Sequence, residues 1–111
     1  MRLLLLNANT TCAVTDFCVD AARRFARPDT IISGSTGQFG AANITSRAQN
    51  VVAGHALIDL VQQHASNHDC ILIAVSYDTA LLAAREISQI PVIGEAALRS
   101  ASLVGRRIGL V

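Results

Sequence analysis

Side-chain amides, hydroxyls and small residues follow four apolar runs of the chain, at the point where each run ends. Asn7, Asn9 and Thr10 follow the first run, and Ser76 and Thr79 follow the third. The four turns comprise residues 7–10, 35–37, 76–79 and 94. At helix N-termini such groups offer N–H donors beside a positive dipole end, which suits a carboxylate or another small anion. The same residue types also serve as ordinary helix caps, so the pattern leaves a binding edge and plain capping both open.

Alternating strands and helices must position these turns. We expect strands at residues 3–6, 30–33 and 90–93, and another in the first half of 69–86. Helices are expected from the Thr10–Thr11 caps to Pro28, from about 45 to 65, in the second half of 69–86 with Asp78 or Thr79 as N-cap, and from 94 to 103. The alternation implies right-handed βαβ units on a parallel sheet, with the turns gathered at the carboxyl edge where ligands bind.

The two longest helices are expected to pack through apolar stripes. The first stripe comprises Val14, Phe17, Cys18, Ala21, Ala22 and Phe25. The second comprises Ile44, Ala48, Val51, Val52, His55, Ile58 and Val61, which makes His55 a core histidine rather than a base. His64 and His68 flank a polar loop and are expected to be solvated.

Composition excludes several classes of function. The 111 residues suffice for one domain, and 51% apolar against 15% charged residues indicates a compact core. The net charge is +1, the basic residues are scattered, and Trp is absent, so we expect no nucleic-acid partner. All nine basic residues are Arg, so the chain has no lysine for a pyridoxal Schiff base or a phosphate loop.

The three cysteines, Cys12, Cys18 and Cys70, form no C-x-x-C pair. This argues against a disulfide framework or a zinc site and fits a reducing compartment. We expect Cys18 and Cys70 in the core, while Cys12 lies in a helix's first turn where a thiol pKa can fall. The apolar start is too short for a signal-peptide core, and no run reaches transmembrane length. We therefore expect a cytoplasmic protein without a membrane partner.

The apolar run at 107–111 is read as a fifth strand, preceded by Gly105 at the end of the fourth helix. An apolar strand is normally followed by further structure, which predicts that the chain is the first part of a longer protein. A short edge strand that ends the domain is the alternative. An exposed sheet edge favours pairing with another chain, so a homo-oligomer is expected.

With these segments placed, the chain resembles the aspartate/glutamate/hydantoin racemase superfamily, and within it the hydantoin and allantoin racemase branch. Residues 6–11, LNANTT, are similar to the branch's N-P-N-T start, with Ala8 in place of proline. Residues 39–47 are similar to its F-G-x-x-x-I-x-S-R segment, and 73–86 to I-A-C-F-x-D-P-G-L-x-A-A-R-E, followed by Pro-Val-Ile-Gly at 91–94. The resemblance covers the whole chain in order.

The resemblance implies an α/β fold: a flavodoxin-like open parallel sheet of about four strands with helices on both faces, forming one lobe of a two-lobe racemase. Residues 1–105 would form the first lobe, and 106–111 would begin a truncated second lobe. It also implies an isomerase that needs no cofactor or metal and acts on a small carboxylate, amino acid or hydantoin-like ring. One cysteine from each lobe would remove and return a proton at a carbon alpha to a carbonyl.

The chain departs from this pattern at its third turn. Val75 occupies the position of the first-lobe cysteine and cannot transfer a proton, and the second-lobe cysteine lies outside the sequence. We therefore expect the chain alone to be inactive. Ser76 is the remaining candidate for catalysis, and the substrate-binding candidates are Asn7, Asn9, Thr10, Phe39, Ser76 and Thr79. Two alternatives stay open: a non-catalytic carboxylate-binding module, and an isomerase or lyase that uses a hydroxyl or water held by Ser76.

Overall fold

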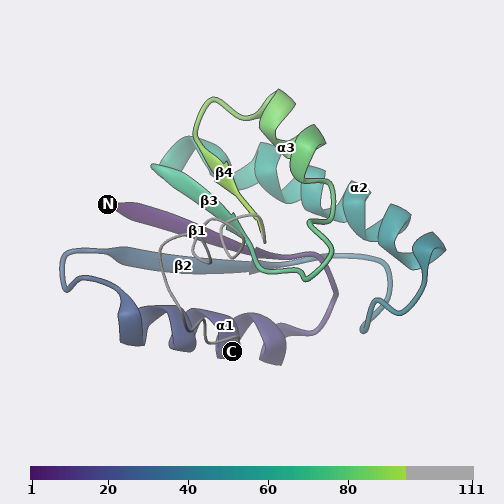
Figure 1. The fold of residues 1–111 in the computed structure, drawn as a ribbon, viewed down its shortest axis with the longest axis horizontal. Helices are drawn as coiled ribbons and strands as arrows, with labels where there is room; N and C mark the ends of the chain where they lie inside the picture. The colour runs from purple at the N-terminus through teal and green to yellow at the C-terminus, as the bar shows by residue number, and fades with distance from the viewer. Residues whose placement is uncertain (95–111) are drawn as a thin grey trace, which may run out of the picture.

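A computed structural model describes residues 1–94 as a parallel sheet between helices (Figure 1). Its strands are β1 (Arg2–Asn7), β2 (Ile31–Thr36), β3 (Cys70–Ile73) and β4 (Val92–Ile93). The helices are α1 (Cys12–Phe25), α2 (Arg47–His64) and α3 (Leu81–Ile87), with a single 3₁₀ turn at Ala65–Asn67. The strand order is β2-β1-β3-β4 and every pairing is parallel, which confirms the predicted α/β architecture. The expected helix at 94–103, Gly105 and the segment 106–111 lie outside the described residues, apart from Gly94.

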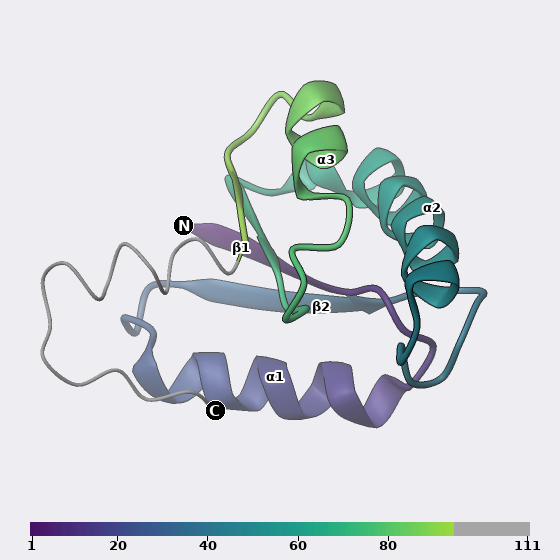
Figure 2. The ribbon, with the colours of Figure 1, turned by 45° about the vertical axis from the view of Figure 1, so that its right-hand side comes forward.

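The helices cover the two faces of the sheet separately, with α1 on one side and α2 and α3 on the other (Figure 2). Side chains alternate along β1, so Leu4 and Leu6 join the larger cluster with Leu57 of α2, whereas Leu5 joins Val19 of α1 in the smaller one. These β1 leucines are at most 1% exposed, so the central strand is buried on both faces, as its unbroken apolar run predicts. Within residues 1–94, no helix combines the length and apolar character that a membrane crossing requires.

Strand β2 extends three residues beyond the predicted end at 33, because residues that look like a loop pair with β1. Gly34 lies opposite Leu5, and Thr36 lies opposite Asn7. A Cβ at Gly34 would stand 2.6 Å from a methyl carbon of Val19, so α1 packs too closely for a side chain here. The glycine therefore marks a tight helix–strand contact rather than a flexible turn.

The predicted inward stripe of α1 is correct for Cys18 and Ala22, which pack against the smaller cluster, and wrong for its large aromatic members. Phe17 and Phe25 are 60% and 82% exposed, whereas Thr15 and Val19 are buried. The Thr15 hydroxyl lies 2.6 Å from the Thr36 hydroxyl, and this polar contact turns a different face of the helix toward the sheet. The core cysteines, by contrast, are as expected: Cys70 is buried, and Cys18 packs against the smaller cluster.

The predicted stripe of α2 is also wrong in most of its members. Val51 is 74% exposed, and besides the predicted Val61 the helix buries Ala53, Ala56, Leu57 and Leu60. The two alanines let the helix approach the sheet closely, which hydrophobicity alone does not reveal. His55 is exposed rather than in the core: its ring packs edge-on against Phe39, with centroids 5.1 Å apart.

His68 is bound on both ring nitrogens rather than solvated. Its Nε2 lies 2.6 Å from the Ser33 hydroxyl and its Nδ1 lies 2.7 Å from the His64 carbonyl oxygen. These contacts fasten the segment between α2 and β3 to strand β2.

Gly37 supports the turn after β1 through its lack of a side chain. Its N–H donates to the Asn7 carbonyl at 2.8 Å, and a Cβ there would stand 2.6 Å from the Ala8 carbonyl oxygen. We expect Gly37→Ala to lower the free energy of unfolding by about 1–3 kcal/mol, because backbone must move to admit the methyl group. Urea denaturation followed by circular dichroism measures this change.

Gly54→Ala is the matched control within α2. A Cβ at Gly54 would lie 3.5 Å from the Ala80 Cβ, an ordinary contact, so the better helix former should leave stability unchanged or raise it by up to about 1 kcal/mol. Equal destabilisation by the two substitutions would show that the turn does not constrain Gly37.

Candidate functional site

A cavity lies at the edge of the sheet where successive strands are added on opposite sides of β1. Strands β2 and β3 flank β1 on opposite sides, so the carboxyl ends of β1 and β3 form the topological switch point, the usual ligand position in such sheets. The cavity has a volume of about 210 Å³. It is lined by Asn7, Asn9, Val14, Asn43, Ile44, Ala74, Val75, Ser76 and Tyr77.

Asn7 is a buried amide that holds the first turn of the site together. It is 1% exposed, and its Nδ2 donates to Asn9 Oδ1 at 2.7 Å and to Thr15 Oγ1 at 3.1 Å. Its Oδ1 accepts the Asn9 N–H at 3.2 Å. Because the amide is occupied on both ends, Asn7 positions the turn rather than offering a group to a ligand.

Asn9 is the side chain that this network presents to the cavity. Its Oδ1 accepts from Asn7 Nδ2 and, at 2.9 Å, from the Thr11 N–H, which fixes the orientation of the amide. Its Nδ2 has no protein partner within residues 1–94 and is the available donor. The arrangement replaces the predicted side-chain cap, since neither Thr10 nor Thr11 caps α1 through its hydroxyl.

The opposite wall is the loop 74–80, which begins earlier and ends later than predicted. Strand β3 stops at Ile73, and α3 is preceded by Ala80 rather than capped by Asp78 or Thr79. Asp78 and Ala80 have φ of 50° and 53°, a left-handed conformation that costs about 1–2 kcal/mol at a non-glycine residue. Between them, Thr79 is buried and donates to Asn50 Oδ1 at 2.6 Å, which anchors the loop on α2.

The structure gathers three of the six predicted substrate-binding residues, Asn7, Asn9 and Ser76, around this cavity. The other three do not line it. Thr10 donates its N–H to the Ala41 carbonyl, Phe39 packs on His55, and the Thr79 hydroxyl is bonded to Asn50. Val75, where the sequence resemblance predicts a thiol, lines the cavity and packs against the larger core cluster.

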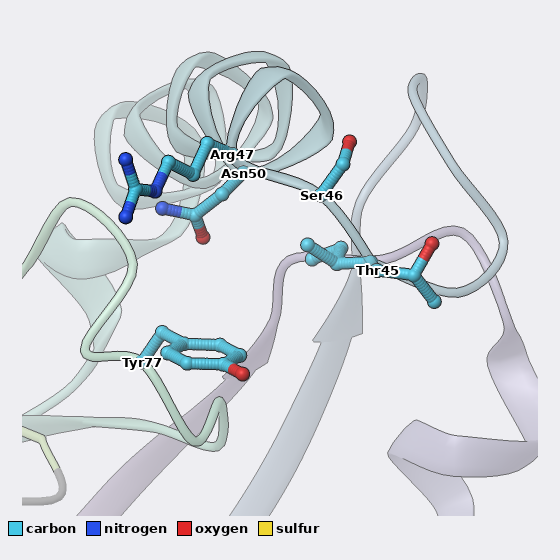
Figure 3. A pocket seen from close by; sticks show the side chains of 6 residues that line it. Thr45, Ser46, Arg47, Asn50 and Tyr77 are labelled. Atoms are coloured by element: carbon cyan, nitrogen blue, oxygen red, sulfur yellow. The ribbon is translucent and has the colours of Figure 1, made fainter.

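A larger hollow of about 460 Å³ adjoins the first one, at the start of α2 (Figure 3). The two hollows share Ile44 and Tyr77, and the larger one is further lined by Thr45, Ser46, Arg47 and Asn50. Sequence reasoning missed this wall. Its signal in the sequence is the Ser46-x-x-Gln49 spacing, which is typical of a capping box and in the structure makes Ser46 the N-cap of α2.

The capping box at the start of α2 uses several polar groups of the larger hollow, and the groups that remain determine which ligand could bind there. Ser46 Oγ accepts the Gln49 N–H at 3.2 Å, and Gln49 Oε1 accepts the Thr45 N–H at 2.7 Å. The charged lining of both hollows is Arg47 alone, with no Asp or Glu. Neither lining contains a thiol or an imidazole, so the described part of the site is suited to bind an acceptor-rich or anionic molecule and lacks a strong base.

The three cysteines stand apart from both hollows. Cys12 is exposed, and Cys18 is partly covered. Burial raises the pKa of the Cys18 thiol above its ordinary value. Burial also raises the pKa of Cys70, aided by the Asp69 carboxylate and opposed by the N-terminal ammonium group. Within residues 1–94, no three His, Cys, Asp or Glu side chains lie close enough together to hold a metal ion.

Comparison with known proteins yields one consistent family. A family model described as Asp/Glu/Hydantoin racemase matches residues 3–111. The hydantoin racemase of Paenarthrobacter aurescens is 32% identical over 115 residues, which cover 100% of this chain and 49% of that protein. The hydantoin racemase of Pseudomonas sp. strain NS671 is also 32% identical, over 114 residues that cover 100% of this chain and 46% of that protein.

Solved structures agree with the sequence matches. Allantoin racemase from Klebsiella pneumoniae superposes with a TM-score of 0.86 at 33% identity, covering 93% of this chain and 43% of that one. Allantoin racemase from Pseudomonas fluorescens gives a TM-score of 0.86 at 31% identity, covering 95% of this chain and 46% of that one. The chain therefore spans about half the length of the relatives that it matches.

The Asn7 network should contribute measurably to stability. We expect Asn7→Ala to lower the free energy of unfolding by about 1–3 kcal/mol, because it removes the buried amide that holds the Asn9 turn and one of the two hydrogen-bond partners of the Thr15 hydroxyl. The control Thr10→Ala should change stability by less than about 0.5 kcal/mol, because the Thr10 hydroxyl has no hydrogen bond within the described chain. Urea denaturation compares the two, and equal losses would contradict a special role for Asn7.

Thiol labelling should separate the three cysteines. Only the thiolate reacts, so a raised pKa lowers its population at a given pH, and burial further blocks access. We expect iodoacetamide at pH 8 to modify Cys12 first in the native protein, and Cys18 and Cys70 at the same rate as Cys12 only after denaturation. Peptide mapping by mass spectrometry reports each rate; native labelling of Cys70 as fast as that of Cys12 would contradict the burial described above.

Proposed function

The chain belongs to the Asp/Glu/hydantoin racemase family, and we propose that it forms the first lobe of a racemase-type isomerase acting on a small carboxylate, amino acid or hydantoin-like ring. The observation that carries the proposal is the 210 Å³ cavity at the β1/β3 switch point, lined by Asn9, Val75 and Ser76. In this proposal residues 1–105 are the first lobe, and 106–111 begin the second.

The reaction that fits this cavity is removal and return of a proton at a carbon alpha to a carbonyl. The carbanion that forms shares its charge with the carbonyl oxygen, so a fixed N–H donor beside that oxygen lowers the barrier. Asn9 Nδ2 supplies such a donor, because its orientation is set by two hydrogen bonds before any ligand arrives. Asn7 acts through Asn9 and is a positioning residue.

The described part of the chain supplies binding and electrostatics but no base at the position of Val75. Racemisation requires proton-transfer groups on both sides of the substrate carbon. The hydrocarbon side chain of Val75 has no ionisable atom and therefore cannot transfer a proton. The adjacent Ser76 is exposed. We propose that the 111 residues alone do not racemise substrate and that proton transfer depends on groups beyond them, without a cofactor.

Val75 also favours a second candidate function, a non-catalytic binding module of the same fold. Such a module would keep the amide donors and the cavity while losing the proton-transfer group. A third route, an isomerase or lyase that uses a water or hydroxyl held by Ser76, requires Ser76 for turnover. Cytoplasmic location and homo-oligomerisation remain predictions of the sequence.

Proton exchange tests the role of position 75 directly. We expect the native chain to bind 5-benzylhydantoin but to exchange its C5 hydrogen for deuterium no faster than buffer does. Val75→Cys should raise exchange by on the order of tenfold, because a thiolate can remove the C5 proton and return a deuteron to the same face. Proton NMR in D₂O follows exchange, and chiral chromatography shows whether configuration is retained.

Two further variants decide between the candidates. Val75→Ala enlarges the cavity without adding a thiol and should leave exchange at the buffer rate. Ser76→Ala should have no effect on the native chain. Exchange catalysed by the native chain and abolished by Ser76→Ala would replace the proposal with the Ser76 route, and failure of every variant to bind the ring would refute it.

A further inference from the structure

We propose that Arg47 and Asn50 form a carboxylate subsite, which selects hydantoin-like substrates whose ring substituent ends in a carboxylate. The proposal rests on the function proposed above for the placement of the ring, and it adds the chemical class of the substituent. Its basis is the 460 Å³ hollow at the start of α2, where one cation and one fixed amide face an aromatic side chain (Figure 3).

Arg47 provides the positive charge of the proposed subsite. Arg23 and Arg27 lie 3.4 Å and 3.5 Å from aspartate oxygens, and Arg85 donates to the Val92 carbonyl. The Arg47 guanidinium has no such partner within residues 1–94, and it projects from the first turn of α2 over the hollow (Figure 3). Its planar pair of N–H groups matches the geometry of a carboxylate.

Asn50 provides a second, oriented donor. Its Oδ1 accepts from the buried Thr79 hydroxyl at 2.6 Å, so the Nδ2 end of the amide is left to donate. Arg47 and Asn50 are three residues apart on the helix and therefore project on the same side. The Ser46 hydroxyl accepts the Gln49 N–H and the Thr45 hydroxyl donates to Gln49 Oε1, and both side chains point away from Arg47 and Asn50 (Figure 3).

The relation between the two hollows fixes which part of the ligand reaches this subsite. They share Ile44 and Tyr77, so a ring in the smaller hollow beside Asn9 directs its substituent across these two side chains into the larger hollow. Tyr77 lies across the open space from Arg47 and Asn50 (Figure 3) and offers an apolar surface to the methylene groups of the substituent. The charged end then meets Arg47.

A pair of isosteric ligands tests the subsite. Hydantoin-5-propionic acid and its primary amide differ only in the charge and donor pattern of the terminal group. We expect the native chain to bind the acid about fivefold more tightly than the amide, a modest factor because the hollow is open to solvent. Isothermal titration calorimetry at pH 7 measures both affinities.

Three variants test whether Arg47 and Asn50 cause the preference for the acid over the amide. Arg47→Gln should abolish the preference for the acid while leaving the affinity for the amide within about twofold. Asn50→Asp keeps an oxygen for the Thr79 hydroxyl but replaces the Nδ2 donor with a negative oxygen, so it should reverse the preference. Arg24→Gln, on the outer side of α1, removes an exposed arginine of the opposite face and should change nothing.

The outcomes also separate this inference from the proposed function. Equal binding of acid and amide by the native chain, or a preference that survives Arg47→Gln, would overturn the subsite while unsubstituted hydantoin still bound. If unsubstituted hydantoin and both ligands failed to bind, the proposed function and the subsite would fall together.

Discussion

The buried carboxamide of Asn7 is the group on which the geometry of the site depends. It stands at the end of the central strand and joins three separate segments: the turn that carries Asn9, the Thr15 hydroxyl of α1, and through it Thr36 of β2. A buried amide is costly unless its donors and acceptor are paired. That requirement brings the segments to fixed positions, and the orientation of Asn9 toward the cavity follows.

The loop 74–80, which forms the second wall of the cavity, is also fixed by a buried polar side chain that must be hydrogen-bonded. The Thr79 hydroxyl, buried between two left-handed residues, is paired with Asn50 of α2, while the Ala74 N–H at the start of the loop donates to the Leu6 carbonyl of β1, so the loop 74–80 is held by both the helix and the sheet. The framework of the cavity thus depends on Asn7 and Thr79, and neither of these contacts involves the side chain of Val75.

The α/β class and the positions of the strands followed from sequence because unbroken apolar runs and turn residues are local signals. The faces of α1 and α2 did not, because polar and small residues decided them: Thr15 turns inward to reach Thr36, and Ala53 and Ala56 allow close approach where Val51 was expected. For the site, turns at strand ends identified Asn7, Asn9 and Ser76. Arg47 and Asn50 escaped notice because they lie at the start of a helix that follows a long loop.

The position of β1 at the centre of the sheet also has a consequence for the order of assembly during synthesis. Leu3 pairs with Ile32 on one side and Cys70 on the other, so β1 is synthesised before both of its neighbours and completes its pairing only when β3 has been made. Pairing between such distant positions is slow, and the leucine run stays open to chaperones or to another nascent chain in the interval. The cavity at the switch point, bordered by both Asn9 and Ser76, is complete only after that second pairing has occurred.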